Sequence, residues 1–217
     1  VGARLVYLSN PDNPMGSFLD RAVIEAMVAD LPDGCLLCLD EAYADFVEAD
    51  ALPVIYADHP QVIRMRTFSK AFGIAGMRIG YAITNTAIAD AFNRVRNHFG
   101  VNSVGQAAAL TALEDVKHQQ SVRVAVADSL ARIAEIASAH KCIALPTHTN
   151  FIAIDCGRDG DFAGRVLSSL VEQGIFVRMP AVAPLNRCIR VSAGTSADID
   201  LFETAFPKAL MAADSQD

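Results

Sequence analysis

The sequence predicts an α/β fold, in which a mostly parallel sheet is followed by a smaller α+β domain. In the first part of the chain, short continuous apolar runs alternate with helical stretches, as is typical of a parallel sheet that helices cover on both faces. In the second part, strands and helices follow one another without that alternation. Polar residues stand directly after several early apolar runs, and open α/β sheets bind ligands at these carboxyl ends of their strands.

The first part is expected to contain four strands and one long helix. The apolar run at residues 4–8 predicts the first strand. Apolar residues then recur at helical spacing from Leu19 to Leu31, which predicts a helix. The remaining expected strands are residues 36–39, 62–65 and 79–83.

The second part begins with helices and ends with a mixture of both elements. The expected helices are residues 86–95, 103–113, 119–139 and 161–173, and a last one from residue 197. The expected strands are residues 142–145, 151–155, 176–178 and 188–192. The domain boundary is expected among the helices between residues 105 and 130.

Composition argues against several classes of protein. The 217 residues are 52% apolar, which is enough for a substantial core and argues against disorder. A net charge of −7 and a pI near 5.2 argue against a nucleic-acid partner or an anionic membrane surface. No signal-like segment opens the chain, and no apolar stretch approaches the ~18 residues that span a bilayer.

The cysteines do not indicate a metal or redox site. Cys35 and Cys38 have a C-x-x-C spacing, but they lie inside an apolar run, and no second pair of Cys or His completes a site. We therefore expect no metal, and we expect buried, reduced cysteines in a cytoplasmic protein.

Four motifs in a fixed order carry the chemistry of this chain. The stretch NPDNPMG contains Asn13, and LLCLDEAY contains Asp40. RTFSKAFG contains Lys70, and GMRIGY contains Arg78 eight residues later. Each motif follows or joins an apolar run, so these polar side chains are expected at one mouth, at the strand ends.

This constellation resembles the fold-type-I aminotransferases of class I/II, and most closely the histidinol-phosphate aminotransferases, which use pyridoxal 5'-phosphate. The resemblance extends from Leu5 to about Phe206. It implies an aspartate-aminotransferase-like fold and a homodimer. Residues 1–110 would be the C-terminal part of the large, cofactor-binding domain, and residues 111–217 the small C-terminal domain.

The resemblance implies roles for the residues of these motifs. Lys70 would form the Schiff base with the cofactor and then move the substrate proton, and Asp40 would keep the pyridine nitrogen protonated. Tyr43 and Asn13 would hydrogen-bond the phenolic oxygen. The residues that would hold the phosphate are Arg78, Thr67 and Ser69. The alternatives are a surface lysine at position 70, a helix N-cap at Asp40 and an ordinary half-buried aromatic at Tyr43.

Two arginines of the second part resemble substrate-binding residues. Arg190, in CIRVSAGT, matches an arginine that binds the substrate carboxylate, and Arg178 matches a second anion-binding arginine. Either arginine could instead be an ordinary strand residue. His98 and Gly100 replace a usual proline and asparagine, and Met15 replaces a usual threonine. These departures leave histidinol phosphate open as the substrate.

The expected function is transfer of an amino group between an anionic amino donor, such as histidinol phosphate or an amino acid, and a 2-oxo acid such as 2-oxoglutarate. A decarboxylase or lyase of the threonine-phosphate decarboxylase type and a non-catalytic truncated domain remain open. The family's Gly-rich phosphate turn, its ring-stacking aromatic residue and its cross-subunit tyrosine would lie upstream of Val1. We therefore expect this chain alone to be inactive and to bind the cofactor weakly.

Overall fold

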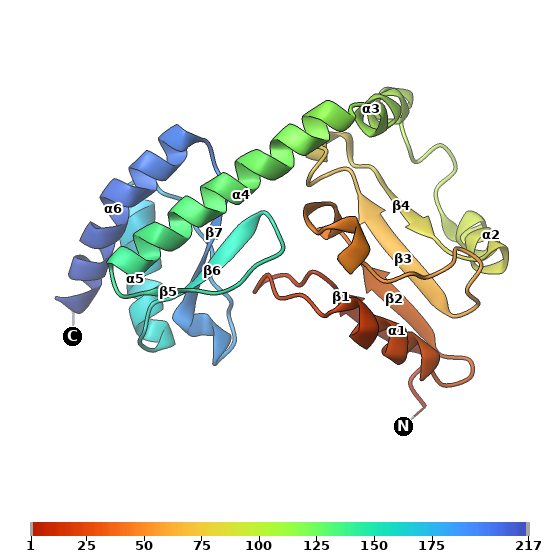
Figure 1. Ribbon diagram of the computed structural model, residues 1–217, viewed down its shortest axis with the longest axis horizontal. Coiled ribbons are helices and arrows are strands. Elements are labelled where there is room, and N and C mark those ends of the chain that lie inside the picture. Colours follow the sequence, from red (N-terminus) through yellow and green to blue (C-terminus); the bar gives the residue numbers. More distant parts are fainter. Residues whose placement is uncertain (1, 216–217) are drawn as a thin grey trace. The chain divides into compact units, whose positions relative to one another are not determined.

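Two sheets organise the chain, whose residues 2–215 are described by the computed structural model (Figure 1). The first unit combines the residues up to Asp12 with Ser17–Val122. The second unit combines the short segment Asn13–Gly16 with the chain from Arg123 onward. Each unit has its own sheet and its own hydrophobic core.

The sheet of the first unit is mixed, with three parallel strands and one antiparallel strand. Its order is β1 to β4, in which β1 pairs with β2 and β2 with β3 in parallel, whereas β3 and β4 are antiparallel. The expectation of a mostly parallel sheet is confirmed, with β4 as the one antiparallel strand. The strands are β1 (Leu5–Ser9), β2 (Leu36–Asp40), β3 (Val62–Thr67) and β4 (Gly80–Ile83).

Helices of the first unit pack on this sheet and on the loop after β3. Helix α1 (Arg21–Ala29) buries Ile24 against Leu37 and Leu39 of β2. Two further helices, α2 (Thr86–Val95) and α3 (Ser103–Glu114), begin at Asn85 and Asn102, whose side chains cap them. Buried residues of α3 and of the loop after β3 form a second apolar cluster, made of Phe68, Phe72, Ile79 and Ala109.

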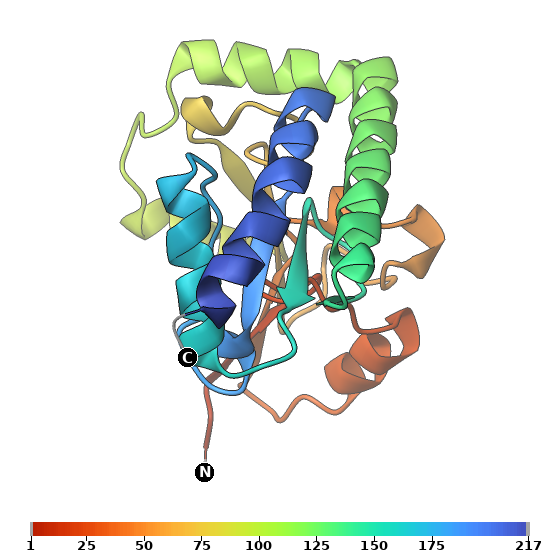
Figure 2. The same ribbon diagram turned by 90° about the vertical axis from the view of Figure 1, so that its left-hand side faces the viewer.

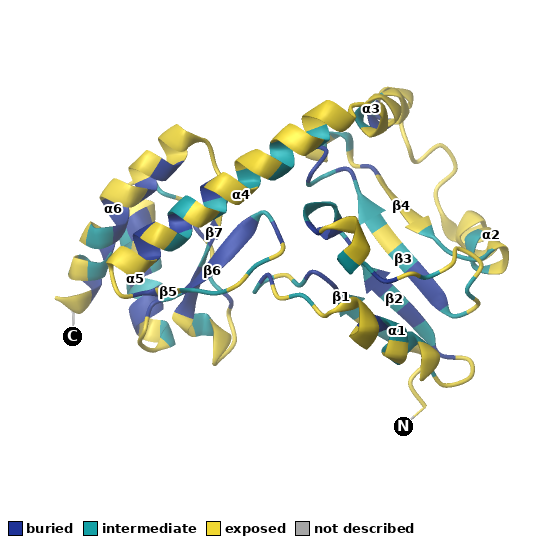
Figure 3. Ribbon diagram, in the orientation of Figure 1, coloured by how far each residue is buried: buried dark blue, intermediate teal, exposed yellow. Residues whose placement is uncertain are grey.

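The second unit is an antiparallel sheet with helices on one face. Figure 2 shows α4, α5 and α6 beside one another in front of this sheet, and Figure 3 shows that β6 is almost wholly buried. The strand order is β5-β6-β7, and the core joins these strands to Phe202 and Phe206 of α6. The elements are α4 (Val116–Ala139), β5 (Ile143–Ala144), β6 (Phe151–Asp155), α5 (Gly160–Glu172), β7 (Cys188–Ser192) and α6 (Ser196–Asp214).

One expected strand is wrong in the second unit. Residues 176–178 do not form a strand, because only Arg178 pairs with the sheet, through an isolated antiparallel bridge to Arg190. The division between the two units falls between Val122 and Arg123, inside α4.

No helix within residues 2–215 is both long enough and apolar enough to span a membrane.

Candidate active site

A pocket of about 480 Å³ opens at the carboxyl ends of β2 and β3 in the first unit. Asp40 and Thr67 are the last residues of these two strands, and parallel strands end at the same edge of a sheet. The pocket therefore brings five of the candidate residues together. Its polar lining consists of Asp40, Arg66, Thr67, Ser69, Lys70 and Arg78.

Local backbone geometry carries Lys70 and Arg78 to this pocket. The Thr67 hydroxyl accepts a hydrogen bond from the Ser69 N–H at 3.1 Å, which turns the chain directly after β3. Arg78 adopts a left-handed conformation, with φ of 55°, and its guanidinium donates to the Ala75 carbonyl at 2.8 Å. At Gly80, an added Cβ would lie only 2.7 Å from the Arg66 carbonyl oxygen, so β4 approaches β3 closely only with glycine there.

The Asp40 carboxylate has a donor on each oxygen. The Ala42 N–H donates to Oδ1 at 2.9 Å, and the Tyr7 hydroxyl donates to Oδ2. The hydrogen bond to Asp40, followed by partial burial, raises the pKa of Tyr7 to about 12. The sequence had indicated no role for Tyr7, and its position in an apolar run gave no signal of this contact.

Tyr43 lies beneath the Lys70 amine. The Lys70 Nζ is 5.1 Å from the centre of the Tyr43 ring, within the range of a cation–π interaction. Tyr43 is buried, with 4% of its surface exposed, so the surrounding residues hold its ring in place beneath the lysine side chain. The 3₁₀ turn Ala44–Phe46 begins directly after Tyr43 and anchors it at the end of β2.

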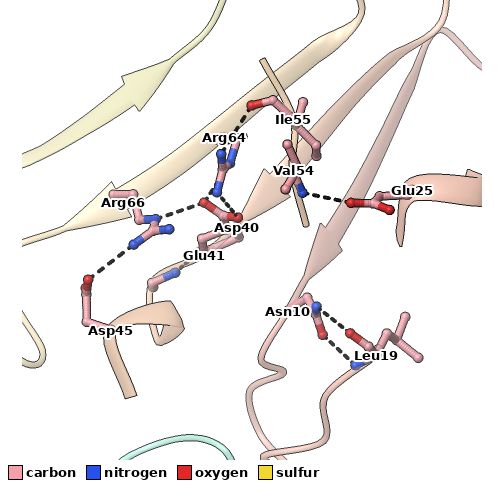
Figure 4. A network of polar contacts seen from close by, with 11 residues as sticks. Asn10, Leu19, Glu25, Asp40, Glu41, Asp45, Val54, Ile55, Arg64 and Arg66 are labelled. Carbon is pink, nitrogen blue, oxygen red and sulfur yellow. Dashed lines mark hydrogen bonds and ion pairs between the residues drawn. The ribbon is translucent and has the colours of Figure 1, made fainter. Parts of the chain in front are cut away.

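A buried ionic network lies next to Asp40 (Figure 4). Glu41 is only 1% exposed, and it accepts hydrogen bonds from Arg64 at 2.8 and 3.0 Å and from Arg66 at 2.8 Å. Arg66 also reaches Asp45 at 3.2 Å. Burial lowers the pKa of Arg66, but the charge and hydrogen bond of Glu41 more than offset it, so the pKa is raised overall. Met65 pairs with Asp40 and Arg64 precedes Met65 in β3, so alternation turns the Arg64 side chain to the opposite face of the sheet from Asp40.

The remaining candidate residues belong to the second unit. Arg190 donates to the Asn13 side-chain oxygen at 2.6 Å, and its guanidinium lies 4.8 Å from the centre of the Phe151 ring. Its Nε is buried and has no hydrogen-bond partner within residues 2–215. Arg178 pairs with Arg190 through two backbone hydrogen bonds, at 2.6 and 3.1 Å. The Arg178 guanidinium lies 5.1 Å from the centre of the Phe176 ring, so each of the two arginines has an aromatic ring beside it.

His98 does not line this pocket. His98 is exposed on the segment after α2. Within residues 2–215, no group of three or more His, Cys, Asp or Glu side chains is arranged to hold a metal ion.

The sequence model of the class I and II aminotransferases matches residues 1–205. The chain belongs to this family. The histidinol-phosphate aminotransferase 2 of Pseudomonas aeruginosa is 38% identical over 210 residues, which are 95% of this chain and 56% of that protein. The resemblance to histidinol-phosphate aminotransferases that the motifs indicated is therefore confirmed.

Solved structures confirm the predicted fold of the aminotransferase chain. The histidinol-phosphate aminotransferase of Sinorhizobium meliloti, solved with pyridoxal 5'-phosphate, matches with a TM-score of 0.93 and 47% identity. The match covers 96% of this chain and 58% of that one. A decarboxylase from Sulfurospirillum multivorans matches with a TM-score of 0.79 and 27% identity, over 95% of this chain and 62% of that one. The chain thus spans a little over half the length of its curated relatives.

Proposed function

We propose that the protein carrying this chain is a pyridoxal-phosphate-dependent aminotransferase. It would move an amino group between an anionic amino donor, such as histidinol phosphate or an amino acid, and a 2-oxo acid such as 2-oxoglutarate. The observation that carries the proposal is that Lys70, Asp40 and Arg78 line one pocket. This trio supplies a primary amine, a carboxylate and a guanidinium to a single ligand.

The chemistry of these side chains fits pyridoxal phosphate. The cofactor presents an aldehyde, a basic ring nitrogen, a phenolic oxygen and a phosphate. A lysine amine suits the aldehyde, a carboxylate suits the ring nitrogen, and an arginine fork suits the phosphate. Thr67 and Ser69 add hydroxyl donors beside Arg78, and the pocket volume lies within the usual range for small-molecule sites.

Each residue has a definite task in this proposal. When bound, the cofactor supplies an electron sink that stabilises negative charge on the substrate carbon. Asp40 holds the proton on the ring nitrogen, and Arg78 anchors the phosphate end. The Lys70 amine attaches the cofactor and then moves the proton between the substrate carbon and the cofactor. Tyr43 holds that amine from below and, like Asn13, would hydrogen-bond the phenolic oxygen.

Arg178 and Arg190 would bind the anionic part of the substrate. The two guanidiniums belong to backbone-paired residues, and the Arg190 Nε–H is a buried donor that has no acceptor within residues 2–215. A bound carboxylate or phosphate would satisfy this donor with a charge-assisted hydrogen bond. This arrangement supports an amino donor with an anionic group.

Chemical labelling tests the proposal directly. The intact protein is incubated with pyridoxal phosphate, reduced with borohydride and digested, and the labelled peptide is identified by mass spectrometry. We expect the label on Lys70, and we expect Lys70→Ala to lose both the label and the turnover. A label on another lysine, or full activity in Lys70→Ala, would contradict the proposal. Lys208, on α6 of the second unit, offers a matched control for substitution to alanine.

A decarboxylase is the second candidate function. It is favoured by the fold similarity at 27% identity to the decarboxylase from Sulfurospirillum multivorans. Asp40, Lys70 and Arg78 would serve either reaction, because both begin by stabilising charge on the same carbon. Product analysis with an anionic amino acid and 2-oxoglutarate distinguishes them, since transamination yields glutamate and decarboxylation yields CO₂. Absence of both products and of a label on Lys70 would favour a non-catalytic domain.

We also propose that the intact protein is a cytoplasmic homodimer. The support is its family membership together with five free cysteines, which suit a reducing compartment. Sedimentation of the intact protein tests the assembly, and a monomer at all concentrations would contradict it.

A further inference from the structure

Tyr7 contacts the carboxylate of Asp40, and the proposed function assigns no role to Tyr7. Its hydroxyl donates to Asp40 Oδ2, while the Ala42 N–H donates to Asp40 Oδ1 at 2.9 Å. Each carboxylate oxygen has two lone pairs, so both oxygens can still accept a further proton donor. The two protein donors therefore hold the carboxylate without blocking it.

The sheet register brings Tyr7 to this position. Tyr7 pairs with Cys38 in the parallel β1–β2 ladder, so both side chains point to the same face. Asp40 lies two residues after Cys38 and also points to that face. The long tyrosine side chain then spans the diagonal from β1 to the end of β2. Ser9, which pairs directly with Asp40, instead donates to the Pro11 carbonyl at 3.1 Å.

The direction of the hydrogen bond is fixed over the pH range in which enzymes work. The hydrogen bond to Asp40 is the largest cause that raises the pKa of Tyr7 to about 12. The phenol therefore stays protonated at neutral pH and acts as a donor to the carboxylate. A pyridinium N–H requires an acceptor, and the oxygens of Asp40 keep lone pairs for it.

We propose that Tyr7 is a positioning residue that orients the Asp40 carboxylate for the ring nitrogen of the cofactor. This inference rests on the proposed function. A carboxylate at the end of a strand would otherwise rotate about its side-chain bonds, and ordering it would cost free energy on binding. Tyr7 and Ala42 hold it from two different elements, β1 and the turn after β2. The alternative is that Tyr7 contributes only packing on the sheet.

The experiment compares two cofactors in the intact protein. Dissociation constants are measured for pyridoxal phosphate and for deazapyridoxal phosphate, in which carbon replaces the ring nitrogen and Asp40 has no proton to hold. The variants are Tyr7→Phe, Asp40→Ala and the double variant. Tyr56→Phe is the matched control, because it removes a hydroxyl from an exposed tyrosine of the same unit.

We expect Tyr7→Phe to weaken pyridoxal phosphate binding by about 5- to 30-fold, the factor that corresponds to 1–2 kcal/mol. Binding of the deaza analogue should not change, and Tyr7→Phe should have no further effect in the Asp40→Ala background. Equal weakening for both cofactors would show that Tyr7 is merely structural. Unchanged affinity for pyridoxal phosphate would also overturn the inference, while leaving the label on Lys70 and hence the proposed function intact. If the wild-type protein binds neither cofactor, the proposed function fails and the inference fails with it.

Discussion

Replacing Glu41 by glutamine should strongly destabilise the first unit. Glu41 is 1% exposed and accepts three charged hydrogen bonds, at 2.8, 2.8 and 3.0 Å, from Arg64 and Arg66. Glutamine keeps the shape, but it removes the charge and turns an amide N–H₂ towards a guanidinium that can only donate. Breaking a buried ion pair by removing one partner costs about 3–5 kcal/mol. Both arginine side chains are 14% exposed and Arg66 keeps Asp45, so we expect the lower end, about 3 kcal/mol.

Intrinsic fluorescence can follow this unit alone. The chain has no tryptophan, and its four tyrosines, at positions 7, 43, 56 and 81, all belong to the first unit. For an m-value of about 1–3 kcal/mol/M in urea, a loss of 3 kcal/mol lowers the unfolding midpoint by about 1–3 M. Glu25→Gln is the matched control, because Glu25 forms an exposed pair with Arg21, at 2.8 Å. Its Oε1 also accepts a hydrogen bond from the Val54 N–H at 2.9 Å, but glutamine keeps that acceptor, so the midpoint should shift little.

A small effect would refute the reasoning about Glu41. If Glu41→Gln shifts the midpoint no more than Glu25→Gln does, water reaches the two arginines. The network then contributes no more to the free energy of unfolding than an exposed ion pair. A changed m-value would instead show that the substitution altered the denatured state or the cooperativity of unfolding.

Three further outcomes are expected. Gly80→Ala should cost about 1–3 kcal/mol, because its Cβ would meet the Arg66 carbonyl at 2.7 Å, whereas Gly76→Ala, with open space, should be neutral in the same urea assay. The hydrogen bond of Tyr7 should make wild type more stable than Tyr7→Phe below pH 10.0, the ordinary pKa of tyrosine. This advantage should disappear as the pH rises towards 12, and pH-dependent urea midpoints that stay parallel would contradict it. Burial raises the pKa of the Cys156 thiol to about 12, so iodoacetamide should label it near neutral pH only after unfolding; rapid labelling of the native chain, measured by mass spectrometry, would show that the site is open.

The strands and the pocket residues could be predicted because their signals are local. Short segments rich in apolar residues marked the strands, and the polar residues after them, such as Asp40 and Lys70, had to lie at the strand ends. The strand expected at residues 176–178 was wrong for a related reason. Its apolar pattern is local, but strand formation requires a partner, and only Arg178 finds one.

The contacts that position these residues could not be predicted, because they depend on register across long sequence separations. Tyr7 meets Asp40 across 33 residues, and Glu41 meets Arg64 and Arg66 across 23 and 25 residues. A one-residue shift of β1 against β2 would have turned Tyr7 to the opposite face. The sequence indicated no role for Glu41. Its partners, Arg64 and Arg66, lie in a strand where arginines alternate with other residues, and this pattern does not reveal an ion pair.

The ionic network beside the pocket also shapes the electric field that a ligand meets there. Arg64 and Arg66 carry two positive charges, and Glu41 and Asp45 carry two negative ones, so the four groups cancel. The field of such a neutral group of charges falls off much faster with distance than that of a single ion, and Arg66, although it lines the pocket, contributes little long-range attraction. Lys70, Arg78 and Asp40 are left to set the local potential, with one positive charge in excess. The charges of Lys70, Arg78 and Asp40 therefore favour an anionic ligand such as a phosphate ester, whereas Arg66 adds little to this attraction.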